Sequence, residues 1–237
     1  MKLLSLLEKL ILPIFLLCLL FCLTTVFSHL TQDANWNRFL AINWHRIVEL
    51  LDLREENTIA TWFSSIVFFL TALSFVLLGW GHAPHYHPHS QQRLIFKLAA
   101  LATCLLSADE VGSLHETAGS WADRSLTLLQ DTPIYGMGYP WLLLSPIIVL
   151  VFAFIVFNLF QITALVNQVQ ETVKIRALLW AAIVILPSVF VFEFMEAYLG
   201  YLRQKNTFFP VIEELLEVMG MFCLYMANIL IARYYRL

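Results

Sequence analysis

The chain has 237 residues, of which 60% are hydrophobic, 14% aromatic and only 13% charged, and its mean hydropathy is +0.75. A soluble domain usually carries about a quarter charged residues, so this composition excludes an ordinary cytosolic enzyme and a disordered chain. The formal net charge of −3 and the isoelectric point near 6.1 provide no basic surface for a polyanion, which excludes a nucleic-acid-binding protein.

Six apolar runs are long enough to cross a bilayer of about 30 Å as helices of about 20 residues. They lie near residues 8–29, 59–80, 93–117, 140–165, 177–199 and 211–233. The runs are continuous rather than alternating, so transmembrane strands are not expected. The sequence therefore predicts an all-α integral membrane protein: a bundle of six transmembrane helices that forms a single domain over 1–237.

The first run permits two interpretations. Lys2 and Lys9 flank a long apolar core, and Val26-Phe27-Ser28 weakly resembles the cleavage site of a secretory signal peptide. The core is longer than a signal peptide usually has, so we expect a retained first helix. In either case the loop that follows lies outside.

That loop, from 31 to 58, is predicted to hold an amphipathic helix over 34–53 on the outer surface of the membrane. Apolar residues recur there at roughly helical spacing: Trp36, Phe39, Leu40, Ile47, Val48 and Leu51. Arg54 and Glu56 follow directly, and we expect the next helix to begin with Asn57 or Thr58 as its N-cap.

The distribution of basic residues favours cytoplasmic N- and C-termini. With the N-terminus inside, the predicted inner segments hold eight Lys and Arg residues and the outer segments hold six. The inner loop after the second run contains His82, His85, His87 and His89. Its two prolines favour an extended polar turn over a fixed metal cage.

Eight acidic residues fall inside the predicted spans, where few are expected. They are Asp109, Glu110, Glu116, Glu193, Glu196, Glu213, Glu214 and Glu217, and His115 joins the first group. The directions of the third, fifth and sixth runs bring all of them to one side of the membrane. At about 100° per residue, three pairs each share a helix face: Asp109 with Glu116, Glu193 with Glu196, and Glu213 with Glu217. Glu110 and His115 point elsewhere on the third run.

Carboxylates held close together raise one another's pKa and are costly in a membrane, so cations, protons, water or arginine must compensate them. Carboxylates with an imidazole suit Mn, Fe, Zn, Mg or Ca, and helix bundles use such sets to hold metals. We therefore expect a divalent metal site in the outer half of the bundle, with these ligands: Asp109, His115, Glu116, Glu193, Glu196, Glu213 and Glu217. The second choices around this site are Glu110, Glu214, Arg54 and Glu56.

Solvated helix ends are the alternative explanation. Glu213 and Glu214 follow Pro210 at a helix start, where the helix dipole favours anions. This explanation does not extend to the acids of the third and fifth runs, which lie towards helix C-terminal ends.

Three segments resemble a group of uncharacterised bacterial multi-pass membrane proteins. They are Glu55–Ser65, the DE-x4-HE segment over Asp109–Glu116, and the EE-x2-E segment that begins Glu213–Gly220. The resemblance covers about 50 to 225 and implies that the three segments belong together; we separately expect the protein to lie in the bacterial inner (cytoplasmic) membrane. The resemblance implies no activity.

Three classes of function remain open. The first is a membrane metalloenzyme that acts on a lipid or lipid-linked substrate. The second is a cation or proton transporter, which would need a polar path to the inner face; the acid-bearing runs offer little there beyond Thr103, Cys104 and Ser107. The third is a non-catalytic subunit or assembly factor with membrane protein partners.

Overall fold

The computed structural model describes residues 2–32, 58–82, 86, 88–114, 117, 121, 145–163, 169–202 and 208–237. Within these residues the protein is almost entirely helical and has no strand. The helices are α1 (Lys2–Gln32), α3 (Ile59–Trp80), α4 (Ser90–Gly112), α6 (Ser145–Thr163), α7 (Val169–Tyr201) and α8 (Phe208–Tyr235). Each of the six predicted runs therefore forms a helix. The predicted amphipathic segment 34–53 lies outside the described residues.

Five of these helices, all except α4, are long and apolar enough to cross a membrane. This finding is compatible with an integral membrane protein. Charged residues stand at both ends of the apolar stretch of α4: Arg93 and Lys97 near its start, and Asp109 and Glu110 near its end. They explain why α4 is the least apolar of the six.

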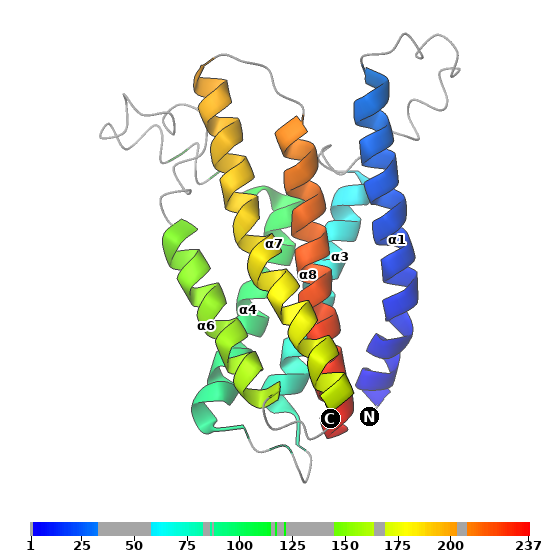
Figure 1. Ribbon diagram of the computed structural model, residues 1–237, viewed down its shortest axis with the longest axis vertical. Coiled ribbons are helices and arrows are strands. Elements are labelled where there is room, and N and C mark those ends of the chain that lie inside the picture. The colour runs from blue at the N-terminus through cyan, green and yellow to red at the C-terminus, as the bar shows by residue number, and fades with distance from the viewer. Residues whose placement is uncertain are drawn as a thin grey trace.

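The helices pack side by side in one bundle, with α1 and α6 on opposite flanks (Figure 1). Helices α3 and α8 form the centre, because 67% and 61% of their apolar windows are buried, against 22–28% for α1, α6 and α7. They run in the same direction. Thr71 Oγ1 on α3 donates to the Met221 carbonyl on α8 over 3.3 Å, and Asn228 Nδ2 donates to Ser74 Oγ over 3.0 Å.

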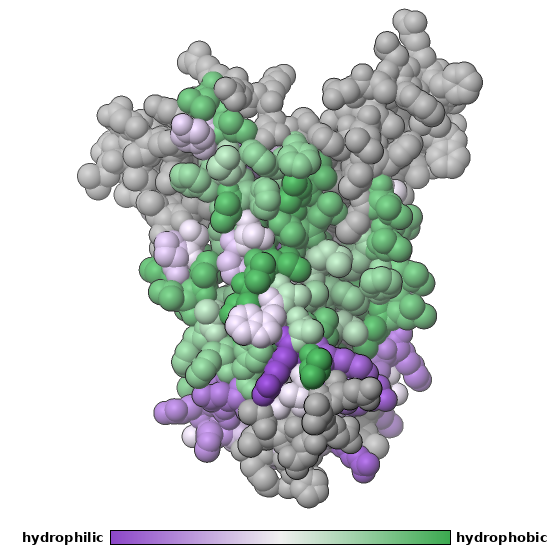
Figure 2. Space-filling view, in the orientation of Figure 1, coloured by the Kyte–Doolittle hydropathy of each residue, from purple (hydrophilic) through white to green (hydrophobic). Residues whose placement is uncertain are grey.

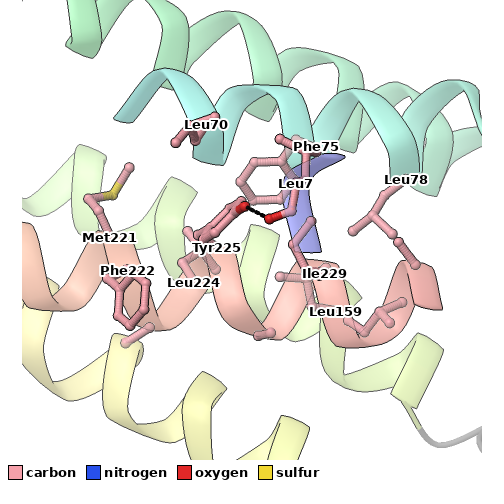
Figure 3. Close-up of a cluster of buried hydrophobic side chains, with 14 of the residues drawn as sticks. Leu7, Leu70, Phe75, Leu78, Leu159, Met221, Phe222, Leu224, Tyr225 and Ile229 are labelled. Carbon is pink, nitrogen blue, oxygen red and sulfur yellow. Dashed lines mark hydrogen bonds between the residues drawn. The ribbon is translucent and has the colours of Figure 1, made fainter. Parts of the chain in front are cut away.

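Large apolar side chains fill the space between the central helices and their neighbours (Figure 3). Phe75, Leu159 and Ile229 are at most 1% exposed. The Tyr225 hydroxyl donates to the Leu7 carbonyl over 2.6 Å, which ties α1 to α8 and satisfies a phenol that would otherwise lose its hydrogen bonds to water. The first predicted helix is thus an integral part of the packed bundle.

The face of the bundle that Figure 2 shows is apolar over most of its height. Exposed leucines and isoleucines cover the outward faces of the peripheral helices, among them Leu12, Leu16, Leu101, Leu105, Ile147 and Leu150. Water would solvate such a continuous apolar belt poorly, whereas lipid chains cover it without cost.

The two ends of the bundle carry opposite charge. Every Lys and Arg among the described residues lies at the end that holds both chain termini (Figures 1 and 2). We call this the basic end: Lys2, Lys9, Arg93, Lys97, Lys174, Arg176, Arg233 and Arg236. Of the described acids, all but Glu8 and Glu171 lie towards the opposite, acid end: Asp109, Glu110, Glu193, Glu196, Glu213, Glu214 and Glu217.

The turn between α3 and α4 folds back into the basic end. Tyr86 is 2% exposed, and its hydroxyl donates to the Leu78 carbonyl over 2.7 Å. Burial raises the pKa of Tyr86, so the phenol stays protonated as a donor. His82 lies beside Arg93, and the His89 backbone N–H donates to the Gln92 side chain over 3.0 Å. His82 and His89 thus take part in structural contacts, whereas His85 and His87 lie outside the described residues.

Helix boundaries match the predictions in some places and differ in others. Helix α3 begins after Thr58, whose hydroxyl accepts from the Thr61 N–H, so Thr58 is the N-cap. The third run, expected near 93–117, is shorter at its C-terminal end. Helix α4 ends at Gly112, and Ser113 adopts a left-handed conformation (φ 43°) while its N–H donates to the Asp109 carbonyl.

Gly220 sets how closely α8 approaches α7. A Cβ added there would lie 2.6 Å from Leu186 Cγ and 3.0 Å from Ile185 Cγ2. We expect Gly220→Ala to destabilise the protein by about 1–3 kcal/mol through overpacking, measured as a lower thermal unfolding midpoint in detergent. Gly112→Ala is the control, because its Cβ would meet Leu114 at an ordinary 3.4 Å. Equal midpoints for the two variants would contradict this packing.

Candidate functional site

Acidic residues of α7 and α8 lie at the same end of the bundle. Glu213 on α8 lies within electrostatic range of Glu217 on the same helix and of Glu196 on α7. Glu193, one turn before Glu196, is 5% exposed. The two helices form an antiparallel pair that packs closely at Gly220, so the C-terminal part of α7 meets the N-terminal part of α8.

Helix α4 contributes Glu110 to the same cluster. Its carboxylate lies within electrostatic range of Glu217 on α8 and of the neighbouring Asp109. The helical wheel places Glu110 off the Asp109 face, and on that ground it was only a second choice. A wheel shows which side chains share a face of one helix but does not show which face meets the next helix. The proximity of Glu110 to α8 therefore depends on how α4 is rotated against its neighbours, which a wheel does not report.

We use the name acid pocket for the four carboxylates that these interactions join: Glu110, Glu196, Glu213 and Glu217. Asp109, Glu193 and Glu214 adjoin them on the same three helices. Three helices that are distant in the sequence therefore bring like charges to one end of the bundle. The other predicted site residues, His115, Glu116, Arg54 and Glu56, lie outside the described residues.

Two serines fix α4 against α3 just below the acid pocket. Ser65 Oγ donates to the Ser107 carbonyl over 2.7 Å, and Ser107 Oγ donates to the Ser65 carbonyl over 2.8 Å. Small hydroxyl residues allow two helix backbones to approach in a membrane protein and join them by hydrogen bonds. Because Ser107 precedes Asp109 by two residues, this reciprocal pair sets the height and rotation of the α4 acids.

A buried polar line along α3 and α8 continues from the acid pocket towards the centre of the bundle. We call it the polar seam: Ser64, Thr71, Ser74 and Asn228, all at most 1% exposed. Ser64 lies seven residues before Thr71 and thus on the same α8-facing side, one step closer to the acid end. Within the described residues, Ser64 Oγ and Asn228 Oδ1 are buried polar atoms with no hydrogen-bond partner.

The polar seam was not predicted from the sequence. Its members are single neutral residues in strongly apolar runs, where they resemble the hydroxyl side chains that commonly bond to their own helix. A signal was present in α3, where Ser64, Thr71 and Ser74 recur at helical spacing on one face. Only the packing of α3 on α8 shows that Asn228 extends this line.

The chemistry open to the acid pocket follows from its composition. Carboxylates accept hydrogen bonds, bind hard cations through oxygen, and share protons when like charges lie close together. Among the described residues, no three His, Cys, Asp or Glu side chains are gathered into a group that could hold a metal ion. Of the predicted ligands, His115 and Glu116 follow the turn at Ser113, outside the described residues.

Comparison with known proteins places the whole bundle in one family. No curated protein and no solved structure matches the chain. A family model with the description "Domain of unknown function (DUF8692)" matches residues 14–230. The match runs from within α1 to within α8, so it includes the acid pocket and the polar seam. The chain therefore belongs to the DUF8692 family.

Proposed function

We propose that this protein is a multi-pass membrane protein whose acid pocket binds a cation, with a divalent metal ion as the first candidate. One observation carries the proposal: at one end of an apolar bundle, acidic residues of α8 lie within electrostatic range of Glu110 on α4 and of Glu196 on α7. All the described Lys and Arg residues belong to the opposite end.

The energetics favour an occupant of positive charge. Two like charges about 4 Å apart repel by about 4 kcal/mol at an effective dielectric constant of about 20. A bound cation or a shared proton offsets this repulsion, and so would a basic side chain reaching in from a neighbouring segment. Carboxylate oxygens select hard cations, so Mn, Fe, Mg and Ca fit best and Zn would require His115 as well.

For the ligands, we propose Glu110, Glu213 and Glu217 as the core of the set. Glu196 and Glu193 approach from α7, and Asp109, His115 and Glu116 would complete the site from the end of α4. If the site is catalytic, the metal would activate a water molecule against a lipid or lipid-linked substrate, and a glutamate left uncoordinated would serve as the base. The apolar lateral surface gives such a substrate direct access from the bilayer.

For the membrane arrangement, we propose six spanning helices, with α4 among them, and a cytoplasmic basic end. The excess of Lys and Arg at that end supports this orientation. The acid pocket then belongs to the outer half, beneath the proposed amphipathic segment 34–53. The bacterial inner membrane is the proposed location.

Elemental analysis of the purified protein tests metal binding. We expect a divalent metal at near-stoichiometric content. We expect Glu217→Gln to reduce this content about tenfold or more, because the variant removes the α8 carboxylate that lies near the acid of α4. Glu171→Gln is the matched control, since Glu171 lies at the basic end in an ion pair with Lys174 (3.2 Å). Metal-free protein of full thermal stability, or equal metal content in both variants, would contradict the proposal.

A cation or proton transporter is the second candidate, and the polar seam is the observation that favours it. The seam leads from the level of the acid pocket to Asn228, seven residues before the end of α8. Transport requires such polar groups across the apolar interior. The short remaining distance to the basic end is filled by apolar and aromatic side chains, including Leu78 and Tyr86.

Flux measurements in proteoliposomes separate this candidate from a static metal site. If the protein transports cations or protons through the seam, Asn228→Leu and Asp109→Asn should each abolish flux. Asn158→Leu should preserve it, because Asn158 on α6 is also buried but donates to its own helix, at the Phe154 carbonyl. Flux that survives both Asn228→Leu and Asp109→Asn would eliminate the transporter.

A further inference from the structure

Lys97, at the basic end, is held in place by two residues of α3. Its ammonium lies 4.6 Å from the centre of the Trp80 ring, a cation–π contact. Its stem crosses Gly79, where an added Cβ would lie 3.0 Å from Lys97 Cγ and 3.2 Å from the Lys97 backbone nitrogen. The absence of a side chain at Gly79 therefore leaves the notch in which the lysine stem lies.

Arg93, one helical turn before Lys97, is also positioned by α3 and the loop after it. Its Nη1 lies 3.2 Å from Nε2 of His82 and can donate to the neutral imidazole. This contact uses one arm of the guanidinium and leaves the remaining N–H groups available. Two cations thus stand one turn apart on α4, each oriented by a neighbour.

Other basic residues at this end are engaged differently. Lys174 pairs with Glu171 over 3.2 Å, and Arg233 approaches Glu8 to 3.8 Å. Arg93 and Lys97 form no ion pair with an acid in the part of the chain that the structure describes. Their charge is therefore available to an anion from outside.

The surroundings of this pair indicate what kind of anion it would meet. Trp80 is 50% exposed, and the α4 residues Leu94 (57%) and Leu98 (55%) are exposed to a similar extent. Tryptophan favours the border between the hydrocarbon and polar regions of a membrane, and exposed leucines favour acyl chains. Helix α4 runs from the basic end into the apolar part of the bundle, so Leu98 and the likewise exposed Leu101 (58%) lie deeper than the two cations, on a surface suited to a lipid's chains.

We propose that Arg93 and Lys97 form a binding site for the phosphate group of an anionic phospholipid, whose acyl chains cover Leu98 and Leu101. The guanidinium fork matches phosphate oxygens, and the lysine adds a point charge fixed over Trp80. Basic sites on the cytoplasmic side of membrane proteins bind anionic headgroups in this way. The site is separate from the acid pocket and goes beyond the function proposed for it.

Native mass spectrometry of the full chain with defined lipids tests this site. We expect phosphatidylglycerol to bind, and the double variant Arg93→Gln/Lys97→Gln to weaken its binding about tenfold or more, as the loss of two fixed charges implies. The double variant Lys174→Gln/Arg176→Gln is the control. It removes two charges at the same end but leaves the site intact, so we expect a change of about threefold or less.

Two further comparisons test whether the phosphate belongs to a lipid and whether a variant loses binding only because it misfolds. Inorganic phosphate at millimolar concentration should not displace the lipid, and phosphatidylcholine should bind more weakly than phosphatidylglycerol. Trp80→Leu should weaken phosphatidylglycerol binding more than Trp180→Leu, since both tryptophans are exposed surface residues (50% and 60%) and only Trp80 orients Lys97. Equal loss in the two charge variants, equal affinity for the two lipids, or full displacement by phosphate would overturn the proposal.

Discussion

The gathering of acidic side chains from α4, α7 and α8 at one end of an apolar bundle is the constraint from which the rest of the structure is best understood. Glu110, Glu213 and Glu217 are held near one another by helices whose own packing is apolar and close. Three devices hold the helices there: the reciprocal Ser65–Ser107 bonds, the close approach at Gly220, and the bond from Tyr225 to α1. Acidic side chains that are buried next to one another are stable only when protons, water or cations compensate their charge, and this requirement is the physical basis of the proposed cation site.

The charge distribution divides the bundle into two regions with separate chemistry. The acid end gathers carboxylic side chains, whereas the basic end presents Lys and Arg residues, among them Lys97 held over Trp80. Between them the α3–α8 contact is mostly apolar but carries the polar seam. Neutral hydroxyl and amide groups are tolerated at such depth far more readily than charges. Because these groups align on one side of α3, neutral polar side chains extend along the α3–α8 contact from the acid end towards the basic end.

Much of the fold could be predicted from composition and periodicity, because helices that cross a membrane need long apolar runs and other apolar segments are seldom as long. The bounds predicted for the second run are those of α3, and every other run forms a helix within a few residues of its expected position or extends beyond it. The break after Gly112 was missed because a left-handed serine depends on local backbone geometry that hydropathy does not report. The convergence of the acids on α7 and α8 followed from helix direction alone. The role of Glu110 and the alignment of Asn228 with α3 could not follow, because both depend on how each helix is rotated against its neighbour.

Disulfide cross-linking in membranes tests most directly whether α4 and α8 bring their carboxylates together. Glu110→Cys and Glu217→Cys would be combined in a chain whose four native cysteines are replaced. The account predicts that this pair forms a disulfide readily under mild oxidation, whereas Glu110→Cys with Glu171→Cys, at opposite ends of the bundle, does not. Cross-linking of the first pair no faster than of the second would contradict a shared acid pocket.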